Sequence, residues 1–482
     1  MARTRNKREA DCMKRVEEAE DRMEGHPISW LVWASERERR LAEWDNIQEE
    51  KQKQWTEVLE VKGIETHDKM TKETFQKLQP SRLQQQMIEL KHPFAESAPP
   101  ACSATGMLQY ARMYYEDILT SRRPQDGVNV DLSSGTDMWD STTLKLHTSA
   151  KLDLDRTFTV EELSQSLKSM AKGKSPGVDG LSVEFYATNW GVLDPLLVEL
   201  YNEVLVGGKL GKGMTHGVIT VMFKKGDKSE VRNWRPISLL NVSYKILAKA
   251  LTHMLSKYLP ELVEKDQGAF VQGRSIFNNI VTAIESLELI QEENRDMVVR
   301  LLDLEKAYDK VGTLRIMGFG ESFCAWVIVM YTFSSSAIMI NDHLSAPFQL
   351  SRSLRQGCPL APLIFVLQLE VLLNKIRLHP DIRGIQLHNG MDCRVKALVD
   401  DLFVVSENTV SSLSALKGVM CEYAELSEAT VNWNKSTYLL PTQFSLKVEW
   451  GMRRVEEGEE ERFLGIWISL QIDVSGQGFH LQ

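Results

Sequence analysis

The sequence Val395-Lys-Ala-Leu-Val-Asp400-Asp401-Leu-Phe-Val-Val405 places two adjacent carboxylates between apolar arms that are rich in β-branched residues. β-Branched residues favour strands and Asp favours turns, so this stretch predicts a β-hairpin with both acids at its bend. Side chains alternate between the two faces of a strand, so only one acid would aim at a given metal ion, and Asp400 is favoured. Taken alone, the pair fits an ordinary turn better than a metal site.

A second acidic element is Met297-Val-Val-Arg-Leu-Leu-Asp303, which predicts a strand that ends in a carboxylate. The two-residue period puts Val299, Leu301 and Asp303 on one face, and Val298, Arg300 and Leu302 on the other. A carboxylate at the end of a buried strand is costly unless a positive group, such as a metal ion, compensates its charge.

The two acidic elements together are more informative than either one. Two Mg²⁺ ions that clamp a phosphoryl transfer require carboxylates that converge from separate elements. Asp303 and the Asp400–Asp401 pair meet this requirement if their strands are neighbours. Hydrolases and topoisomerase-like enzymes could use the same three acids, so these residues narrow the chemistry without fixing it.

Length and composition set broad limits on the protein. The 482 residues predict two to four domains or subdomains, and 43% hydrophobic with 26% charged residues is typical of a globular protein. The net charge of −9 argues against a surface covered with phosphate-binding groups, although a local basic cleft remains compatible with it.

Targeting signals and cysteine usage point to an intracellular protein. The longest apolar runs are too short to span a bilayer, and the basic N-terminus Met1–Arg8 leads into charged residues, unlike a secretory signal. Six scattered cysteines without a CxxC pair predict neither a zinc site nor a disulfide framework. We expect the protein in the nucleus, the cytoplasm or both, with no membrane partner and with the oligomeric state left open.

The texture of the chain suggests four parts. Residues 1–75 are dense in charges with an apolar stripe, which predicts a charged helical extension broken near Gly25–Pro27. Residues 76–156 are expected to form a linker and N-terminal extension, residues 157–470 the main domain, and residues 471–482 a short tail. The stripe in the first part fits a packing face better than a partner-binding coiled coil.

Eight blocks between Ala171 and Ser469 follow one another in an order that is familiar from a known family. They are Lys172–Tyr186, Ile219–Gly226 with Asn233–Leu240, Asp266–Ile276, Asp303–Asp309, Arg355–Phe365, Asp400–Asp401, Asn432–Ser436 and Phe463–Gly465. In this order they resemble the reverse transcriptases of LINE-type (non-LTR) retrotransposons. The resemblance covers about 300 of the 482 residues.

The resemblance implies a fold and an activity. The expected fold is α+β, with the fingers and palm of a right-hand polymerase, an antiparallel palm sheet backed by helices and a helical N-terminal extension. The expected activity is RNA-directed DNA synthesis on an RNA template from a DNA primer with dNTPs. Two Mg²⁺ ions, for which Mn²⁺ could substitute, would be held by Asp303, Asp400 and Asp401.

The resemblance also assigns roles to further residues. Lys224 or Lys225 and Arg235 match positions that grip the incoming triphosphate, and the planar fork of Arg suits two phosphate oxygens. The remaining matches are Tyr308 as an aromatic gate against a ribose 2′-hydroxyl, Gln356 and Gly357 in the base-pair pocket, Lys435 as a proton donor near the pyrophosphate, and Phe463, Leu464 and Gly465 as the primer-grip turn.

Three departures from the family pattern keep a second hypothesis open. First, only Gly312–Met317 separates Val311 from Gly318-Phe-Gly320, which predicts a shortened helix behind Asp303. Second, Leu398-Val399 stands where the family has an aromatic-Ala pair. Third, the sequence stops about 17 residues after Gly465, before the expected thumb. The chain is therefore either a polymerase or a catalytically inactive remnant that at most binds RNA or a protein partner.

Overall fold

The computed structural model describes residues 87–120, 136–305, 311–332, 334–351, 355–456 and 458–470, together with parts of 11–46. Two compact units divide the chain, Met1–Gln85 and Gln86–Gln482. In the first unit the described residues are helical, and Glu36 forms ion pairs with Arg39 and Arg40. These residues lie within the predicted helical extension, residues 1–75, whose expected break near Gly25–Pro27 lies outside the described residues.

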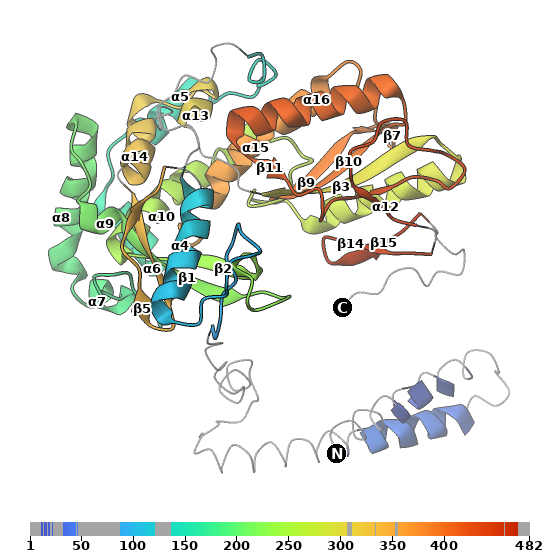
Figure 1. The fold of residues 1–482 in the computed structure, drawn as a ribbon, viewed down its shortest axis with the longest axis horizontal. Helices are drawn as coiled ribbons and strands as arrows, with labels where there is room; N and C mark the ends of the chain where they lie inside the picture. The colour runs from blue at the N-terminus through green and yellow to red at the C-terminus, as the bar shows by residue number, and fades with distance from the viewer. Residues whose placement is uncertain are drawn as a thin grey trace. The chain divides into compact units, whose positions relative to one another are not determined.

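One sheet of the second unit is built around a hairpin, and we call it the β1 sheet (Figure 1). Its central strand pairs antiparallel with β2 and parallel with β4, so Lys224 and Arg235 come to lie at one end of the hairpin. Helix α4 (Ala104–Leu119) packs on this sheet, and its first turn is capped by Ser103. The strands are β1 (His216–Phe223), β2 (Trp234–Leu240), β4 (Ser335–Ile340), β5 (His343–Leu344) and β6 (Phe348–Gln349).

The second sheet, which we call the β3 sheet, has the order β13-β12-β3-β10-β9, with β11 paired to β3. The strand predicted from the apolar alternation is its centre, so both long edges of β3 are hydrogen-bonded to neighbours. The strands are β3 (Met297–Glu305), β9 (Val395–Leu398), β10 (Asp401–Glu407), β11 (Thr430–Val431), β12 (Thr437–Leu439) and β13 (Arg453–Arg454).

Each face of the β3 sheet is covered by different elements. Val298 and Leu302 face a large core that includes α15 (Ala361–Leu378) and α16 (Val410–Ser427), and α16 crosses above the sheet in Figure 1. Val299 and Leu301 face a second core with α12 (Ile276–Glu292) and the hairpin of β14 (Glu461–Phe463) and β15 (Ile466–Ile468). The predicted alternation along β3 is confirmed.

The remaining helices connect the two sheets and pack around buried aromatic side chains. Trp326 is fully buried, and its Nε1 donates a hydrogen bond to the carbonyl of Tyr201, 2.8 Å away. The helices are α5 (Thr148–Asp155), α6 (Val160–Lys168), α7 (Val183–Thr188), α8 (Trp190–Glu203), α9 (Lys212–Thr215), α10 (Val242–Ser256), α11 (Leu259–Leu262), α13 (Val311–Ile316) and α14 (Glu321–Tyr331). A short hairpin of β7 (Ile385–Gln386) and β8 (Asp392–Cys393) precedes β9.

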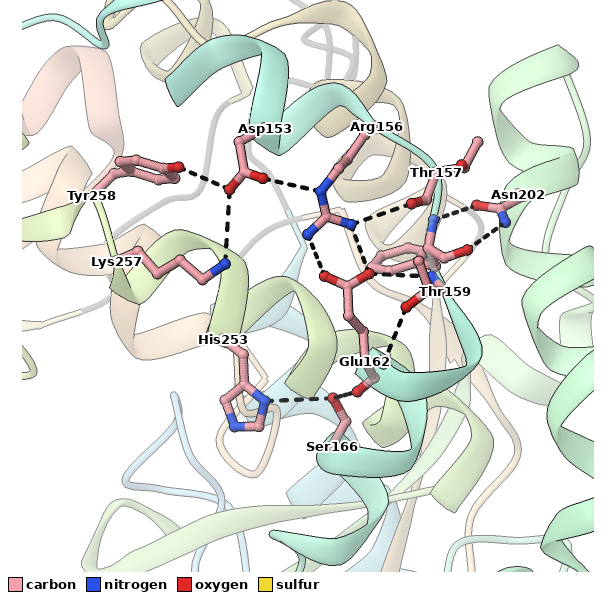
Figure 2. Close-up of polar contacts among 11 residues, drawn as sticks. Asp153, Arg156, Thr157, Thr159, Glu162, Ser166, Asn202, His253, Lys257 and Tyr258 are labelled. Atoms are coloured by element: carbon pink, nitrogen blue, oxygen red, sulfur yellow. Dashed lines mark hydrogen bonds and ion pairs between the residues drawn. The ribbon is translucent and has the colours of Figure 1, made fainter. Parts of the chain in front are cut away.

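A polar network joins α5, α6 and the end of α10 (Figure 2). Arg156 donates from Nη1 to Glu162 at 2.8 Å and from Nε to Asp153 at 3.0 Å. Asp153 also accepts a hydrogen bond from the Tyr258 hydroxyl at 2.8 Å. Thr159 and Glu162 form a reciprocal capping box that starts α6. This network fixes the segment that precedes the first predicted block.

Among the described residues, the helices fall short of the length and apolar character that a membrane-spanning helix requires.

Candidate active site

The two adjacent acids lie at the tip of the β9–β10 hairpin, as the sequence predicts. Leu398 pairs with Asp401, so the turn consists of Val399 and Asp400. Val399 has φ 59°, a region that costs an L-residue about 1–2 kcal/mol. Such a turn normally has Gly at this position, and a β-branched residue persists there only where the surrounding structure holds it.

The third acid lies directly across the sheet from this turn. Asp303 of β3 is in register with Asp401 of β10, so their side chains leave the sheet on the same face. The backbone amide of Leu304 donates to the carbonyl of Asp400 at 3.1 Å, which closes the ladder at this end. The neighbouring-strand condition set by the sequence is therefore satisfied.

The three carboxylates influence one another electrostatically. Desolvation, followed by the charges of Asp400 and Asp303, raises the pKa of Asp401 to about 6. Desolvation is also the main reason that the pKa of Asp400 is raised, and Asp303 adds to it. Burial of these carboxylates therefore favours their protonated form, and nearby positive charge from Lys224 and Arg235 offsets this effect only in part.

Asp303 is fixed by the segment that enters β12. Its backbone amide donates to Ser436 Oγ at 3.2 Å, and its carbonyl accepts from the Asn432 amide at 2.9 Å. Lys435 Nζ lies 3.3 Å from Asp303 Oδ2. The predicted residue Lys435 therefore reaches the site, while Ser436 is a positioning residue that sequence reasoning missed although it stands in the quoted block.

The β1–β2 hairpin supplies positive charge to the same place. Lys224 and Arg235, both exposed, partly offset the rise in the pKa of Asp400 through their charges. Lys225, also exposed, follows Lys224 in the same turn, but no contact places it at the carboxylates. Of the two candidate lysines, Lys224 is the one whose charge acts on Asp400 and Asp401.

The predicted pocket residues Gln356 and Gly357 pack against β2. The carbonyl of Gln356 accepts a hydrogen bond from the Ser238 amide at 2.7 Å. Gly357 has φ 120°, and a Cβ there would lie 2.6 Å from the carbonyl oxygen of Ser238. Only glycine permits this approach, which holds the loop on the strand that carries Arg235.

The block Asp266–Ile276 braces the edge of the β3 sheet beside the acids. Ala397 of β9 donates to the carbonyl of Asp266 and accepts from the amide of Gly268, both at 2.9 Å. The buried Asn279 of α12 also donates from Nδ2 to the carbonyl of Ala397, at 2.8 Å. Arg377 of α15 anchors the block by donating to both carboxylate oxygens of Asp266.

Sequence reasoning missed Asn279, which is a polar residue on the apolar stripe of α12 between Ile276 and Ile280. The sequence feature that could have pointed to Asn279 is an amide side chain at a position of the helix where the apolar period predicts burial. Its partner lies 118 residues away, so the signal names no contact.

Comparisons with known proteins show which family this chain is similar to. Residues 223–468 match the model of the family described as reverse transcriptase (RNA-dependent DNA polymerase). An uncharacterized 149 kDa protein of transposon TX1 from Xenopus laevis is 32% identical over 398 residues, covering 80% of this chain and 29% of that protein. A Pol polyprotein of retrotransposable element R2 from Popillia japonica is 26% identical over 290 residues, covering 58% of this chain and 39% of that protein.

The chain belongs to the reverse transcriptases of LINE-type retrotransposons. It spans well under half the length of these curated relatives. Among solved structures, a Candida albicans telomerase bound to an RNA fragment is 11% identical with a TM-score of 0.34, covering 59% of this chain and 48% of that one. The predicted α+β fold is confirmed, and we use the name palm for the β3 sheet, which carries Asp303 and Asp401.

Of the remaining residues implied by the reverse-transcriptase resemblance, the primer-grip turn is described and the aromatic gate is not. Leu464 and Gly465, with φ 50° and 92°, form the turn between β14 and β15, and Phe463 packs 5.4 Å from the Phe403 ring in the palm core. Tyr308 lies outside the described residues. The segment that begins at Val311 forms the six-residue helix α13, and β3, which carries Asp303, keeps paired strands along both edges.

The reverse-transcriptase family implies the use of a divalent metal ion, and the donor chemistry of the palm fits one. Carboxylate oxygens from Asp303, Asp400 and Asp401 suit a hard divalent cation. Desolvation and the charges of the other two acids raise the pKa of Asp401, so a cation placed beside it would be stabilised. Within the described part of the chain, no three acidic, His or Cys side chains already converge as a metal cage. The ion pair of Asp303 with Lys435 is the contact that a metal would have to share or displace.

Proposed function

We propose that this chain is an RNA-directed DNA polymerase that extends a DNA primer on an RNA template with dNTPs. The observation that carries the proposal is the placement of Asp401 opposite Asp303, with Asp400 in the adjoining turn. Two Mg²⁺ ions, or Mn²⁺ in their place, would be held by these three carboxylates. When bound, such ions activate the primer 3′-hydroxyl and stabilise the charge of the leaving pyrophosphate.

The chain's own residues would bind and orient the nucleotide. Arg235 and Lys224 carry positive charge toward the acids and suit the triphosphate. Lys225 in the same turn is a second candidate for this contact. Gln356 and Gly357, held on β2, would line the pocket of the nascent base pair, and Tyr308 would exclude a ribose 2′-hydroxyl.

Two further elements would act on the leaving group and the primer. Lys435, which lies beside Asp303, would donate a proton to the departing pyrophosphate. The turn Phe463–Gly465 would hold the primer end. Both roles rest on the positions of these residues in the family blocks and on their attachment to the palm.

Primer extension tests the proposal. The purified chain is incubated with an RNA template, an annealed DNA primer, dNTPs and Mg²⁺, beside Asp400→Ala and a control, Asp381→Ala, at an exposed loop position. We expect extension by the wild type and the control and none by Asp400→Ala. Absence of extension from wild-type protein that is folded by circular dichroism would overturn the proposal and leave the inactive-remnant hypothesis.

A further inference from the structure

An exposed aromatic ring stands in an unfavourable backbone conformation beside the active site. Phe270 has φ 58°, and 52% of it is exposed, whereas its neighbours Ala269 and Val271 are each 5% exposed. The left-handed backbone region disfavours a bulky side chain. An exposed phenyl ring also lacks the favourable free energy that its burial in the core would provide. Strain of this kind persists where the surrounding structure enforces it, and it is concentrated at functional sites.

The loop that carries Phe270 is held firmly from within. Arg274 donates to the backbone carbonyls of Val263 at 2.5 Å, Gln267 at 2.8 Å and Pro260 at 3.4 Å, and it also donates to that of Glu264. The ion pair between Asp266 and Arg377 anchors the other side of the same loop. The ring is therefore presented on a fixed frame.

The frame touches the turn that bears the catalytic acids. Gly268, two residues before Phe270, donates to Ala397, and a Cβ on Gly268 would lie 3.5 Å from Leu398 Cδ1. Leu398 is the residue paired with Asp401. A second exposed ring, Phe277, stands in the first turn of α12, which follows the loop.

We infer that Phe270 is a stacking platform for an unpaired base of the RNA template at the edge of the polymerase site, an inference that rests on the proposed function. Every nucleobase offers a π-face to an aromatic ring, so such a contact is tolerant of sequence. We name the template as the ligand because the loop directly contacts the strand that leads into the acid-bearing turn. A template strand that is copied at Asp401 must pass this loop. Stacking involves no counterion release, so its contribution is insensitive to salt, unlike a phosphate contact.

Template binding without turnover tests the platform. The full chain, without divalent metal, is titrated into a fluorescein-labelled DNA primer annealed to an RNA template with a single-stranded overhang. The variants are Phe270→Ala, Phe270→Asn, which suits a left-handed backbone, and Phe270→Trp. The control is Phe94→Ala, at a ring that is 58% exposed elsewhere. Anisotropy is measured at about 50 and about 200 mM salt, where phosphate contacts differ strongly.

We expect Phe270→Ala and Phe270→Asn to weaken binding on the order of tenfold by the same factor at both salt concentrations. Trp should restore affinity and Phe94→Ala should leave it unchanged. A series of templates places an abasic site at each position of the overhang in turn. At one position the abasic site should lower the affinity of the wild type to that of Phe270→Ala. The same abasic template should not lower the affinity of Phe270→Ala any further.

Three results would overturn the platform: unchanged affinity of both Phe270 variants, a loss that no abasic position reproduces, or no binding by the wild type. The first result would leave the exposed ring to a protein partner, and the second would assign it a structural role in the loop instead of a contact with a base. Extension by a wild type whose Phe270 variants bind normally would leave the proposed polymerase standing while the platform fails. Tight, Phe270-dependent binding without extension would support the platform while the proposed polymerase fails.

Discussion

Asp401 lies directly opposite Asp303 in the antiparallel β3–β10 pair, one residue beyond a turn whose Val399 has φ 59°. The two acids belong to elements almost 100 residues apart, and a fixed register brings them to one face of the palm. This face also carries Leu301 and Phe403, so the carboxylates emerge where an apolar core ends. Their shared desolvation is the physical basis of the first prediction.

Asp401→Asn should abolish primer extension while stabilising the metal-free protein at alkaline pH. The pKa of Asp401, raised to about 6 in the folded chain, means that ionisation disfavours folding as the pH rises through that value. At pH 8 the neutral amide of Asn avoids this cost of ionising a partly buried carboxyl group beside two other acids. After solvent screening we expect the free energy of unfolding to rise by up to about 1 kcal/mol. The loss of one metal ligand should lower extension at least about a hundredfold.

Primer extension measures the loss of activity, and thermal unfolding without Mg²⁺ at pH 8 measures the gain in stability. Thermal unfolding with Mg²⁺ then tests whether Asp401 holds the ion. Mg²⁺ should raise the Tm of the wild type more than that of Asp401→Asn, because a ligand stabilises the state that binds it. Asp381→Ala is the control, because it removes one carboxylate and leaves Asp303, Asp400 and Asp401 in place. Equal Mg²⁺ shifts in wild type and Asp401→Asn would refute a role for Asp401 in holding the ion.

Asn279→Ala should impair catalysis more than it impairs binding of template and primer. Asn279 supports the Ala397 carbonyl of the edge strand that leads into Val399, so its loss frees a strained turn and lets the acids move. Loss of this buried hydrogen bond should cost about 1–2 kcal/mol of stability. We expect kcat to fall about tenfold or more, with the affinity for primer–template little changed.

The neighbouring Asn278 is exposed on the same helix, so Asn278→Ala is the matched control. Single-turnover extension separates the two effects, and Asn278→Ala should behave as the wild type. A uniform drop in primer–template affinity with unchanged kcat would show that Asn279 acts on binding and not on the acid-bearing turn.

The palm strands could be predicted from sequence because a two-residue period leaves a direct trace in the order of residues. Val298 to Asp303 alternate as the pleat demands, and the apolar arms around Asp400 fold as the expected hairpin. The alternation rule favoured Asp400 as the acid nearest a shared metal, whereas the register puts Asp401 opposite Asp303. Register depends on pairing across the sheet, which one sequence does not encode locally.

The supporting contacts could not be predicted because they join distant segments through side chains. The hydrogen bond of Asn279 to Ala397, the support of Asp303 by Ser436 and the ion pair of Lys435 with Asp303 all depend on tertiary packing. The shortened segment after Val311 suggested that Asp303 loses its backing, yet strands on both sides still hold β3. The pattern of acids narrowed the chemistry, and only the family resemblance implied a polymerase. The contacts that support the acids could not be predicted from either.

Gly357→Ala should weaken dNTP use selectively. A Cβ would lie 2.6 Å from the Ser238 carbonyl oxygen and would separate the loop from β2, where Ser238 holds Gln356. Since Arg235 is on the same strand, we expect KM for dNTP to rise and kcat/KM to fall about tenfold, or about 1.4 kcal/mol. Steady-state extension at varied dNTP concentration measures both constants.

Gly451→Ala isolates the conformational part of this effect. Gly451 has φ 77°, and a Cβ there would meet nothing within 4 Å. Its substitution should therefore lower stability by about 1 kcal/mol through backbone strain and leave KM for dNTP unchanged. Equal changes in KM for the two alanine variants would mean that the close approach to Ser238 has no part in nucleotide binding.

Glu162→Gln should destabilise the protein at neutral pH and lose this effect in acid. Although desolvation acts in the opposite direction, hydrogen bonds from Arg156 and from the Thr159 amide hold the pKa of Glu162 below its usual value (Figure 2). A lowered carboxyl pKa stabilises the folded state above the unfolded pKa of about 4.3, and this contribution disappears as the pH falls through the folded pKa.

Glutamine can still complete the capping box with Thr159, so this variant removes the charge and keeps the cap. We therefore expect a loss of about 1 kcal/mol and about 2–4 °C in Tm at pH 7, with the two unfolding curves converging below about pH 4. Glu161→Gln removes the same charge from the same first helical turn without touching Arg156, so it controls for the helix dipole. If Glu161→Gln were equally destabilising, or if the Glu162→Gln deficit persisted in acid, the paired carboxylate would not be what fastens α6 to α5.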